Sequence, residues 1–261
     1  PKTTLPRIPD LKTANSILSG QLSIAGATAP IDDKIWLTHG PGKNWVIAAH
    51  SFDWLGDLCA FDDLKSREKA LLLVDQWIDR HSNYSETVWR SDITGRRIIN
   101  WLCWAHLLFD FSGPSFNDRF CRSVARQCAH LNRVSTFDRD GAGRITALAG
   151  QAFGEIVLNG EISNRLSLSL SEELSRQVLA DGGHASRCPE THLRVLSDII
   201  LMRNAFANSN TGIPEYLNNA IDRMCPIVRF FRHSDGCFGQ FNGGGESNAT
   251  LIEHILDLAA S

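Results

Sequence analysis

The feature that most constrains the fold is a helical spacing of apolar residues that recurs along most of the chain. One such face, at positions i, i+3, i+4, i+7 and i+8, is formed by Ala70, Leu73, Val74, Trp77 and Ile78. The same kind of spacing recurs in residues 98–109, 120–131, 144–158, 165–179, 190–206 and 214–231. Turn-rich segments separate these stretches, without strand and helix alternating. The spacing therefore predicts an all-α chain of seven or more helices.

The connections between these helices are unequal in length and rich in turn residues. Successive antiparallel helices of this kind form a bundle, a solenoid or a closed ring of hairpins. Helical repeat families show periods of roughly 34 to 45 residues, and the absence of such a repeat argues against a solenoid. Residues 166–170 alternate apolar and polar residues as a strand would, but the residues after them have helical spacing, so we predict a helix there as well.

The N-terminal part of the chain has a different composition. Residues 20–50 are rich in Gly, Pro and Thr and show no helical period. This composition predicts an extended, loop-rich N-terminal wrap over residues 1–50, followed by a helical domain over residues 51–261.

The charge and hydropathy of the chain argue against two classes of protein. A net charge of -3 and an isoelectric point near 6.3 argue against nucleic-acid binding, which normally needs a basic domain or stripe. No apolar run approaches the roughly 18 to 20 residues of a membrane-spanning helix. Most of the 26 basic residues are arginines, which bind carboxylates and sulfates through two parallel hydrogen bonds, although a GC-rich genome gives the same composition.

Seven cysteines occur without a CxxC pair, and several fall on apolar helical positions. They are typical of reduced, mostly buried thiols. A structural zinc ion needs paired ligands at short spacing, and the sequence offers none, so we predict no metal site.

One turn gathers many proton-active and charged groups: residues 179–196, LADGGHASRCPETHLRVL. His184 follows two glycines, and His192 lies in the first turn of the next helix, where the helix dipole favours a neutral imidazole. Because an imidazole has a pKa of about 6.5, both suit proton transfer, and Arg187 suits an acidic substrate. The alternatives are an exposed loop histidine, a histidine that bonds the loop backbone, and an ion pair between Arg187 and Glu190.

A second candidate lies in the helix over residues 96–104, RRIINWLCW. Arg97 and Trp101 share a helical face, and Asn100 lies beside them. Sugar rings stack on indoles while Arg and Asn bond their oxygens, so this face is a candidate sugar subsite. The alternative is that the tryptophans pack in the core.

A third candidate is the segment FFRHSDGCFGQFNGGGE, residues 230–246. Arg232 and Asn242 lie between aromatic residues, and the glycines allow positive φ angles and close backbone approach. We interpret the segment as an ordered linker in which both residues are candidate substrate contacts. Hinge or interface duty is the alternative.

Three segments resemble the bacterial heparinase II/III-like polysaccharide lyases: HSFDWLGDL (50–58), LSRQVLADGGHASRCPETHLRVLSDIILMR (174–203) and RMCPIVRFFRHSDGCFGQFNGGGE (223–246). The resemblance spans most of the chain and covers the N-terminal helical half of that family. It implies an incomplete (α/α) toroid of antiparallel helical hairpins, followed in the same protein by an antiparallel β-sandwich domain. In that family the active cleft lies between the two domains.

The resemblance also implies β-elimination on a polysaccharide that contains uronic acid. The reaction requires a group that neutralises the sugar carboxylate, a base near C5 and an acid for the departing glycosidic oxygen. Arg or Asn serves the first role and His or Tyr the others, so no metal or organic cofactor is expected. The implied partners are an acidic polysaccharide and the C-terminal β-sandwich domain, expected after the final residues LDLAAS.

The family motif at the turn is roughly DGxxxExSPxYH, and its matching positions here are Asp181, Gly182, Pro189 and His192. Thr191 stands in place of the catalytic Tyr, and a Thr hydroxyl has a pKa far above the phenol value of about 10. Proton transfer is then left to His184 and His192. Where the family has an Asn-His pair, this chain has Gly143 and Arg144, and Arg144 would neutralise a sugar carboxylate.

Two other functions stay open beside the lyase. One is a non-catalytic module that binds acidic glycans or belongs to the cell envelope. The other is a glycoside hydrolase of the helical-ring type, in which Asp181 pairs with Glu190 or Asp235. The resemblance implies a periplasmic location, whereas seven unpaired cysteines are compatible with the cytoplasm.

Overall fold

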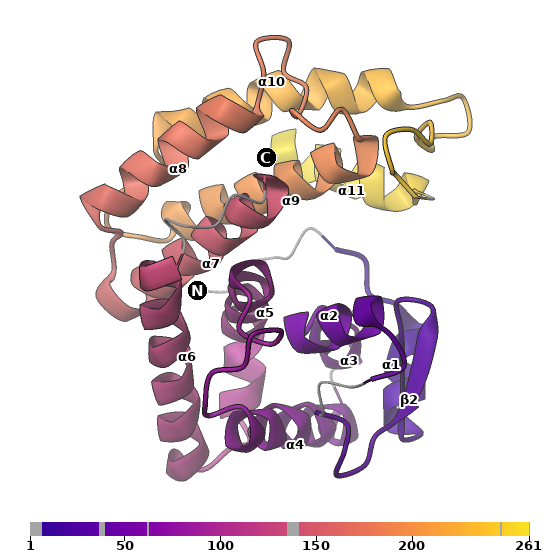
Figure 1. Ribbon diagram of the computed structural model, residues 1–261, viewed down its shortest axis with the longest axis vertical. Coiled ribbons are helices and arrows are strands. Elements are labelled where there is room, and N and C mark those ends of the chain that lie inside the picture. Colours follow the sequence, from indigo (N-terminus) through magenta and orange to yellow (C-terminus); the bar gives the residue numbers. More distant parts are fainter. Residues whose placement is uncertain (1–6, 37–39, 62, 135–140, 246, 261) are drawn as a thin grey trace. The chain divides into compact units, whose positions relative to one another are not determined.

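The computed structural model describes residues 7–36, 40–61, 63–134, 141–245 and 247–260. The chain forms two compact units: the N-terminal unit, residues 9–138, and the C-terminal unit, residues 139–261 together with residues 1–8. Among the described residues there are eleven helices and two short strands, which confirms the predicted all-α class (Figure 1). The units divide between residues 138 and 139, whereas the composition suggested a boundary at residue 50.

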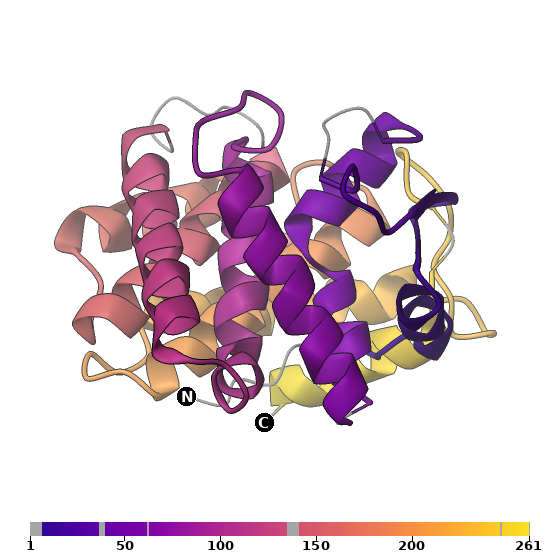
Figure 2. The ribbon, with the colours of Figure 1, turned by 90° about the horizontal axis from the view of Figure 1, so that it is seen from below.

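The N-terminal unit begins with a short helix and a hairpin and continues with further helices. Its elements are α1 (Leu11–Leu18), β1 (Gln21–Ile24), β2 (Ala27–Pro30), α2 (Lys43–Ser51), α3 (Trp54–Cys59), α4 (Leu64–Arg80), α5 (Ser91–Phe109) and α6 (Pro114–Val134). The two strands are antiparallel, with Gln21 opposite Pro30. The long helices α4, α5 and α6 carry the apolar spacing seen in the sequence and pack against one another (Figure 2, purple to magenta).

Residues 1–50 are more regular than their composition suggested. Where the structure describes them, they contain α1, the hairpin and most of α2, so the expectation of an extended wrap is corrected. Asp10 caps α1 by accepting a hydrogen bond from the backbone N–H of Lys12, and α2 buries Trp45 and Ala49. These elements are short, so the Gly, Pro and Thr of their connections dominate the composition of the segment.

An aromatic cluster forms the core of the N-terminal unit. Phe52 contacts four indole rings at centroid distances of 4.9 to 6.1 Å, namely those of Trp36, Trp54, Trp77 and Trp101. Phe52 ends α2 with a φ angle of 61°, a left-handed conformation that costs a bulky residue about 1 to 2 kcal/mol. Its side chain is fully buried, and aromatic burial of this kind offsets such a cost.

The C-terminal unit is built around one enclosed helix. Its elements are α7 (Gly141–Asn159), α8 (Asn164–Gln177), α9 (Pro189–Ala207), α10 (Glu215–Phe231) and α11 (Ala249–Ala260). Twelve of the 19 residues of α9 are buried, and α9 packs against α7, α10 and α11. Residues 166–170 lie inside α8, as predicted, and α11 was not expected from the sequence.

Helices α8 and α10 lie side by side and run in the same direction (Figure 1). Near their N-terminal ends the Ser167 Oγ lies 3.4 Å from the Tyr216 hydroxyl. Near the C-terminal end of α8, Arg223 from the middle of α10 donates a hydrogen bond of 3.3 Å to the Val178 carbonyl. The two contacts span the length of α8, and they join this helix, which precedes the turn singled out in the sequence, to α10, which follows that turn.

Candidate functional site

The segment between α8 and α9, residues 178–188, is the α8–α9 bend. Its backbone is closed by hydrogen bonds from Leu179 N–H to the Gly183 carbonyl at 3.0 Å and from Ala185 N–H to the Gln177 carbonyl at 2.8 Å. The side chain of Asp181 accepts from the Gly183 N–H, as in an Asx turn. These internal hydrogen bonds hold the backbone of the bend in a compact conformation.

Gly182 lets the bend pack directly on α10. Its φ angle is +82°, and a Cβ atom at this position would lie 2.0 Å from the Arg223 carbonyl oxygen. Arg223 also donates from its guanidinium to the carbonyls of Val178 and Leu179. Arg223 therefore contacts the bend twice, through its backbone carbonyl at Gly182 and through its side chain at Val178 and Leu179.

His192 uses both of its ring nitrogens inside the C-terminal unit. Its Nδ1 accepts the backbone N–H of His184 at 3.2 Å, so its proton lies on Nε2, which donates to the Met224 carbonyl at 3.0 Å. Only 1% of the residue is exposed. Burial lowers the pKa of His192 to about 4, with a smaller contribution from His184, so the ring is neutral near pH 7.

His184 is engaged in the same way. Its Nδ1 accepts the Ser186 N–H at 3.1 Å, which leaves the proton on Nε2, directed at the Gln177 Oε1 at 2.9 Å. The residue is 3% exposed, and burial, followed by the charge of Arg194, lowers the pKa of His184. The alternative of an exposed loop histidine is therefore wrong.

The two histidines belong to a hydrogen-bonded network that reaches α7. Beyond His184, the Gln177 amide donates to the Gly141 carbonyl and to Glu173. Glu173 is buried and forms ion pairs with Arg144 at 3.0 Å and with Arg176 at 2.6 Å. We call the set His192, His184, Gln177, Glu173 and Arg144 the bend network. It joins the bend to α7, α8, α9 and α10.

The bend network changes how three predicted residues are understood. Proton transfer to a substrate would require His184 and His192 to reach a cleft, but both rings are buried. Arg144 does neutralise a carboxylate, but the one it meets in the structure is Glu173 of the same unit. Their roles in catalysis and substrate binding stay predictions.

Arg187 and Asn242 are brought together, as candidate contacts of one site would be. The Asn242 side-chain amide donates to the Arg187 carbonyl at 3.0 Å. The Arg187 guanidinium forms an exposed ion pair of 2.7 Å with Asp181, which lowers the pKa of that carboxyl. Glu190 accepts the Gly245 N–H at 2.8 Å rather than pairing with Arg187. The glycine-rich segment thus folds over the start of α9 before the chain enters α11.

Arg232 lies at the start of the same linker, directly after α10, and its guanidinium is engaged in two contacts. Its Nη2 pairs with Glu253 of α11 at 2.6 Å, and its Nε donates to the Gly236 carbonyl at 3.3 Å. These bonds tie the end of α10 to α11. Contact with a substrate stays a prediction for Arg232.

The third predicted group lies in the N-terminal unit, on α5. Arg97 and Trp101 are fully buried, and Asn100 is 3% exposed. Arg97 donates to Gln127 at 2.7 Å and to two backbone carbonyls, and Asn100 donates to the Ser51 carbonyl at 2.9 Å. The expected sugar-binding face is therefore corrected to core packing, which was the alternative for this helix.

Sequence reasoning missed Glu173, Gln177 and Arg223. Glu173 and Gln177 are four residues apart on α8, so they share one helical face, and this spacing was available as a signal. The part played by Arg223 depends on Gly182, about forty residues before it in the sequence, and nothing local indicates that contact.

Some general features bear on the chemistry of the chain. The seven cysteines are present as thiols, and four of them are buried. Among the described residues, no three His, Cys, Asp or Glu side chains are grouped as ligands of a metal ion. In the same part of the chain, no helix has both the length and the apolar character that crossing a membrane requires.

The chain is similar to one curated protein and to several solved structures, and no protein-family model matches it. Over 248 residues it is 30% identical to FtsZ-localized protein C of Caulobacter vibrioides. The alignment covers 92% of this chain and 42% of that protein. The chain thus spans about two fifths of that relative.

The solved structures are polysaccharide lyases. The heparan sulfate lyase HepC of Pedobacter heparinus matches with a TM-score of 0.66 at 16% identity, over 94% of this chain and 42% of that one. A heparinase III structure matches with a TM-score of 0.64 at 16% identity, over 88% and 38% of the two chains. At this level of identity the similarity concerns the fold alone, and it shows that the chain has a heparinase-like helical fold.

Proposed function

We propose that this chain is a non-catalytic, heparinase-like module of a protein that localises with FtsZ. The observation that carries the proposal is that both ring nitrogens of His184 and of His192 are used in hydrogen bonds within the C-terminal unit. In this role the histidines hold the α8–α9 bend in place, and they do not transfer protons to or from a substrate.

The chemistry of β-elimination supports a non-catalytic role. A general base needs a free lone pair within hydrogen-bonding distance of the proton it removes. The lone pair of His192 Nδ1 accepts the His184 N–H, and the lone pair of His184 Nδ1 accepts the Ser186 N–H. Thr191 supplies no acidic phenol in place of the family Tyr. Exposing either ring would break the bend network and leave buried polar groups unsatisfied.

The relative supports the second half of the proposal. FtsZ-localized protein C of Caulobacter vibrioides is 30% identical over 92% of this chain. By its name, that protein localises to FtsZ. We infer that the protein containing this chain does the same and that the lyase fold has been kept there as a scaffold.

Fluorescence microscopy tests the localisation. A fluorescent fusion of the native full-length protein should coincide with FtsZ, and depletion of FtsZ should disperse the signal. The same fusion without residues 1–261 should lose a large part of that coincidence if this chain carries the localisation. A distribution that is unaffected by FtsZ depletion would contradict the proposal.

Elimination on a uronic-acid polysaccharide is the second candidate, because the fold is shared with heparan sulfate lyases. The full-length protein should be incubated with acidic polysaccharides while two products are followed. A lyase yields unsaturated products that absorb in the ultraviolet, a glycoside hydrolase yields reducing ends alone, and a non-catalytic module yields neither.

If an ultraviolet-absorbing product appears, variants of His184 and His192 test whether these histidines catalyse its formation. In a lyase that uses these residues, His184→Ala and His192→Ala lower turnover more than substrate affinity. We expect no absorbing product from the unmodified protein.

A further inference from the structure

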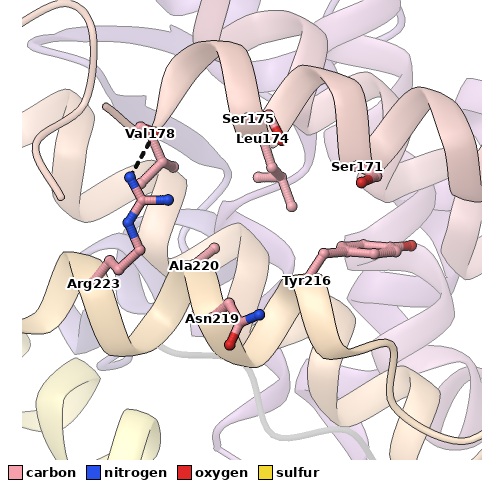
Figure 3. Close-up of a pocket in the computed structure, with 8 residues that line it drawn as sticks. All are labelled: Ser171, Leu174, Ser175, Val178, Tyr216, Asn219, Ala220 and Arg223. Atoms are coloured by element: carbon pink, nitrogen blue, oxygen red, sulfur yellow. Dashed lines mark hydrogen bonds between the residues drawn. The ribbon is translucent and has the colours of Figure 1, made fainter. Parts of the chain in front are cut away.

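A small pocket lies between α8 and α10, within the C-terminal unit and outside the residues singled out in the sequence (Figure 3). Its volume is about 180 Å³. Since one water molecule takes up about 30 Å³ of liquid, the pocket has room for roughly six waters, or one substituted ring.

The floor of the pocket is apolar. It is formed by Leu174 of α8, by Val178 directly after α8 and by Ala220 of α10, all of which are buried. Small residues leave the space open, because Ser171 and Ser175 line the gap on the side of α8 and Ala220 on the side of α10 (Figure 3). Ser171 lies across from Tyr216 (Figure 3). Such a floor suits the apolar face of a saturated ring.

The rim of the pocket is polar. Ser171, Ser175, Asn219 and the half-buried Tyr216 supply hydroxyl and amide groups that both donate and accept hydrogen bonds. Burial raises the pKa of Tyr216, so its hydroxyl keeps its proton near neutral pH. A ligand with several hydroxyl groups would find partners on both helices.

One end of the pocket is cationic. The Arg223 guanidinium uses Nη2 for the carbonyls of Val178 and Leu179, and Figure 3 shows its other terminal nitrogen directed toward the middle of the pocket. Among the described residues that line the pocket there is no carboxylate to neutralise this charge. An anionic group on a ligand would therefore be attracted to this end.

We propose that the pocket between α8 and α10 binds a small ring-shaped hydroxycarboxylate, with the carboxylate on Arg223, the hydroxyls on the serine, asparagine and tyrosine rim, and the ring over the apolar floor. The size, the single uncompensated cation and the mixture of apolar floor and polar rim together select this class. A neutral sugar lacks the charge, and an apolar acid lacks the hydroxyls. The proposal is independent of localisation with FtsZ.

Tyrosine NMR on the 261-residue chain tests the proposal, because the sequence contains two tyrosines. Tyr216 lines the pocket, whereas Tyr84 lies in the N-terminal unit and is 67% exposed, so it serves as an internal control. In a sample with ¹³C-labelled tyrosine rings, Tyr84→Phe assigns the two ring signals. Four probes are titrated: quinate, glucuronate, myo-inositol and cyclohexanecarboxylate.

Quinate or glucuronate should shift the Tyr216 signal with a dissociation constant on the order of 1 mM, and the Tyr84 signal should stay in place. A response to glucuronate alone would identify a sugar acid as the source of the ring. Myo-inositol has the hydroxyls without the charge, and cyclohexanecarboxylate the charge without the hydroxyls, so both should bind about tenfold more weakly or not at all.

Three variants separate binding from folding. Ser171→Leu fills the pocket from its rim and should abolish the shift, while Arg223→Gln should weaken binding about tenfold. Arg229→Gln removes an exposed arginine of α10 that does not line the pocket, and binding should be unchanged. The proposal is overturned if neither hydroxycarboxylate shifts Tyr216, or if Ser171→Leu with an intact Tyr84 signal and unchanged thermal unfolding binds as before.

Discussion

Two buried charged side chains, one in each unit, are stabilised in opposite ways. In the C-terminal unit the side chain of Glu173 is 4% exposed and meets two cations, Arg144 and Arg176. In the N-terminal unit Arg97 is fully buried, and it donates hydrogen bonds to neutral groups: Gln127, Thr94 and two backbone carbonyls. Its guanidinium also lies 4.1 Å from the ring centre of Trp77. One charge is balanced by opposite charges, and the other by dipoles and an aromatic face.

The difference shows what a buried arginine can do without a carboxylate. Burial lowers the pKa of Arg97, yet a guanidinium stays charged in proteins. Its hydrogen bonds reach the His50 carbonyl of α2, the Val88 carbonyl and Gln127 of α6, so one side chain joins several segments of the unit. The desolvation cost is offset only while all of these partners are in place.

Removal of Arg97 should give the largest effect. We expect Arg97→Ala to lower the free energy of unfolding by about 4 kcal/mol, because it leaves a cavity and unsatisfied carbonyls in the aromatic core. The matched control is Arg122→Ala on α6, whose i, i+4 pair with Asp118 has both side chains 65% exposed. That variant should cost under about 1 kcal/mol. Chemical denaturation measures both, and equal losses would contradict the contrast.

The second largest effect is expected from acid, which should lower the stability that the bend network contributes. Burial lowers the pKa of His192 to about 4 in the folded chain, against an ordinary value of 6.5, so the folded state binds fewer protons than the unfolded state. The stabilisation from the neutral ring is therefore complete above pH 6.5 and is lost as the pH falls toward 4. The shift corresponds to about 3 kcal/mol.

Denaturant unfolding between pH 7 and pH 4 measures this loss. The comparison is sharpened by His192→Gln, which cannot titrate and should show a shallower dependence of stability on pH. His81 of the N-terminal unit, whose pKa burial also lowers to about 4, provides a residual dependence in that variant. An identical pH profile for the two proteins would mean that His192 is already exposed in the folded state.

The helices could be predicted well because their signal is local. Leu73 and Trp77 lie one turn apart on α4, and both are buried as the spacing indicates. The same spacing is present at Ile252, Ile255 and Leu256 of α11, where the end of the chain was interpreted as a domain boundary. Short elements such as α1 and the hairpin were missed because each gives too few residues to establish a period.

The candidate site could be predicted only in part, since its chemistry depends on distant partners. The sequence does show that His184 and His192 lie near the same turn. It does not show that the Met224 carbonyl, 32 residues from His192, accepts the hydrogen bond of the His192 ring. Nor does it show that the Gln177 side chain accepts that of the His184 ring. A proton-active residue in a turn is consistent with catalysis and with a structural hydrogen bond. Only the positions of its partners distinguish the two.

Substitution of Gly182 should give the smallest of these losses of stability, and it tests one specific contact. The residue has a positive φ angle, and so does Gly212, but an added Cβ would meet the Arg223 carbonyl at Gly182 and nothing within 4 Å at Gly212. Gly212→Ala should therefore lose about 1 kcal/mol, the cost of the backbone conformation alone. Gly182→Ala should lose about 1 to 2 kcal/mol more, because the bend must move away from α10.

The difference between the two glycine variants isolates the contact between the bend and α10 from the intrinsic strain. Displacing the bend also pulls His184 from the ring of His192, whose Nδ1 accepts the His184 N–H. Loss of that bond frees a lone pair on His192, so Gly182→Ala should raise the pKa of His192 while Gly212→Ala leaves it unchanged. Histidine NMR titration of both variants measures this. If the two variants lose equal stability and give the same His192 titration, the packing of the bend on α10 is not what holds the imidazoles neutral.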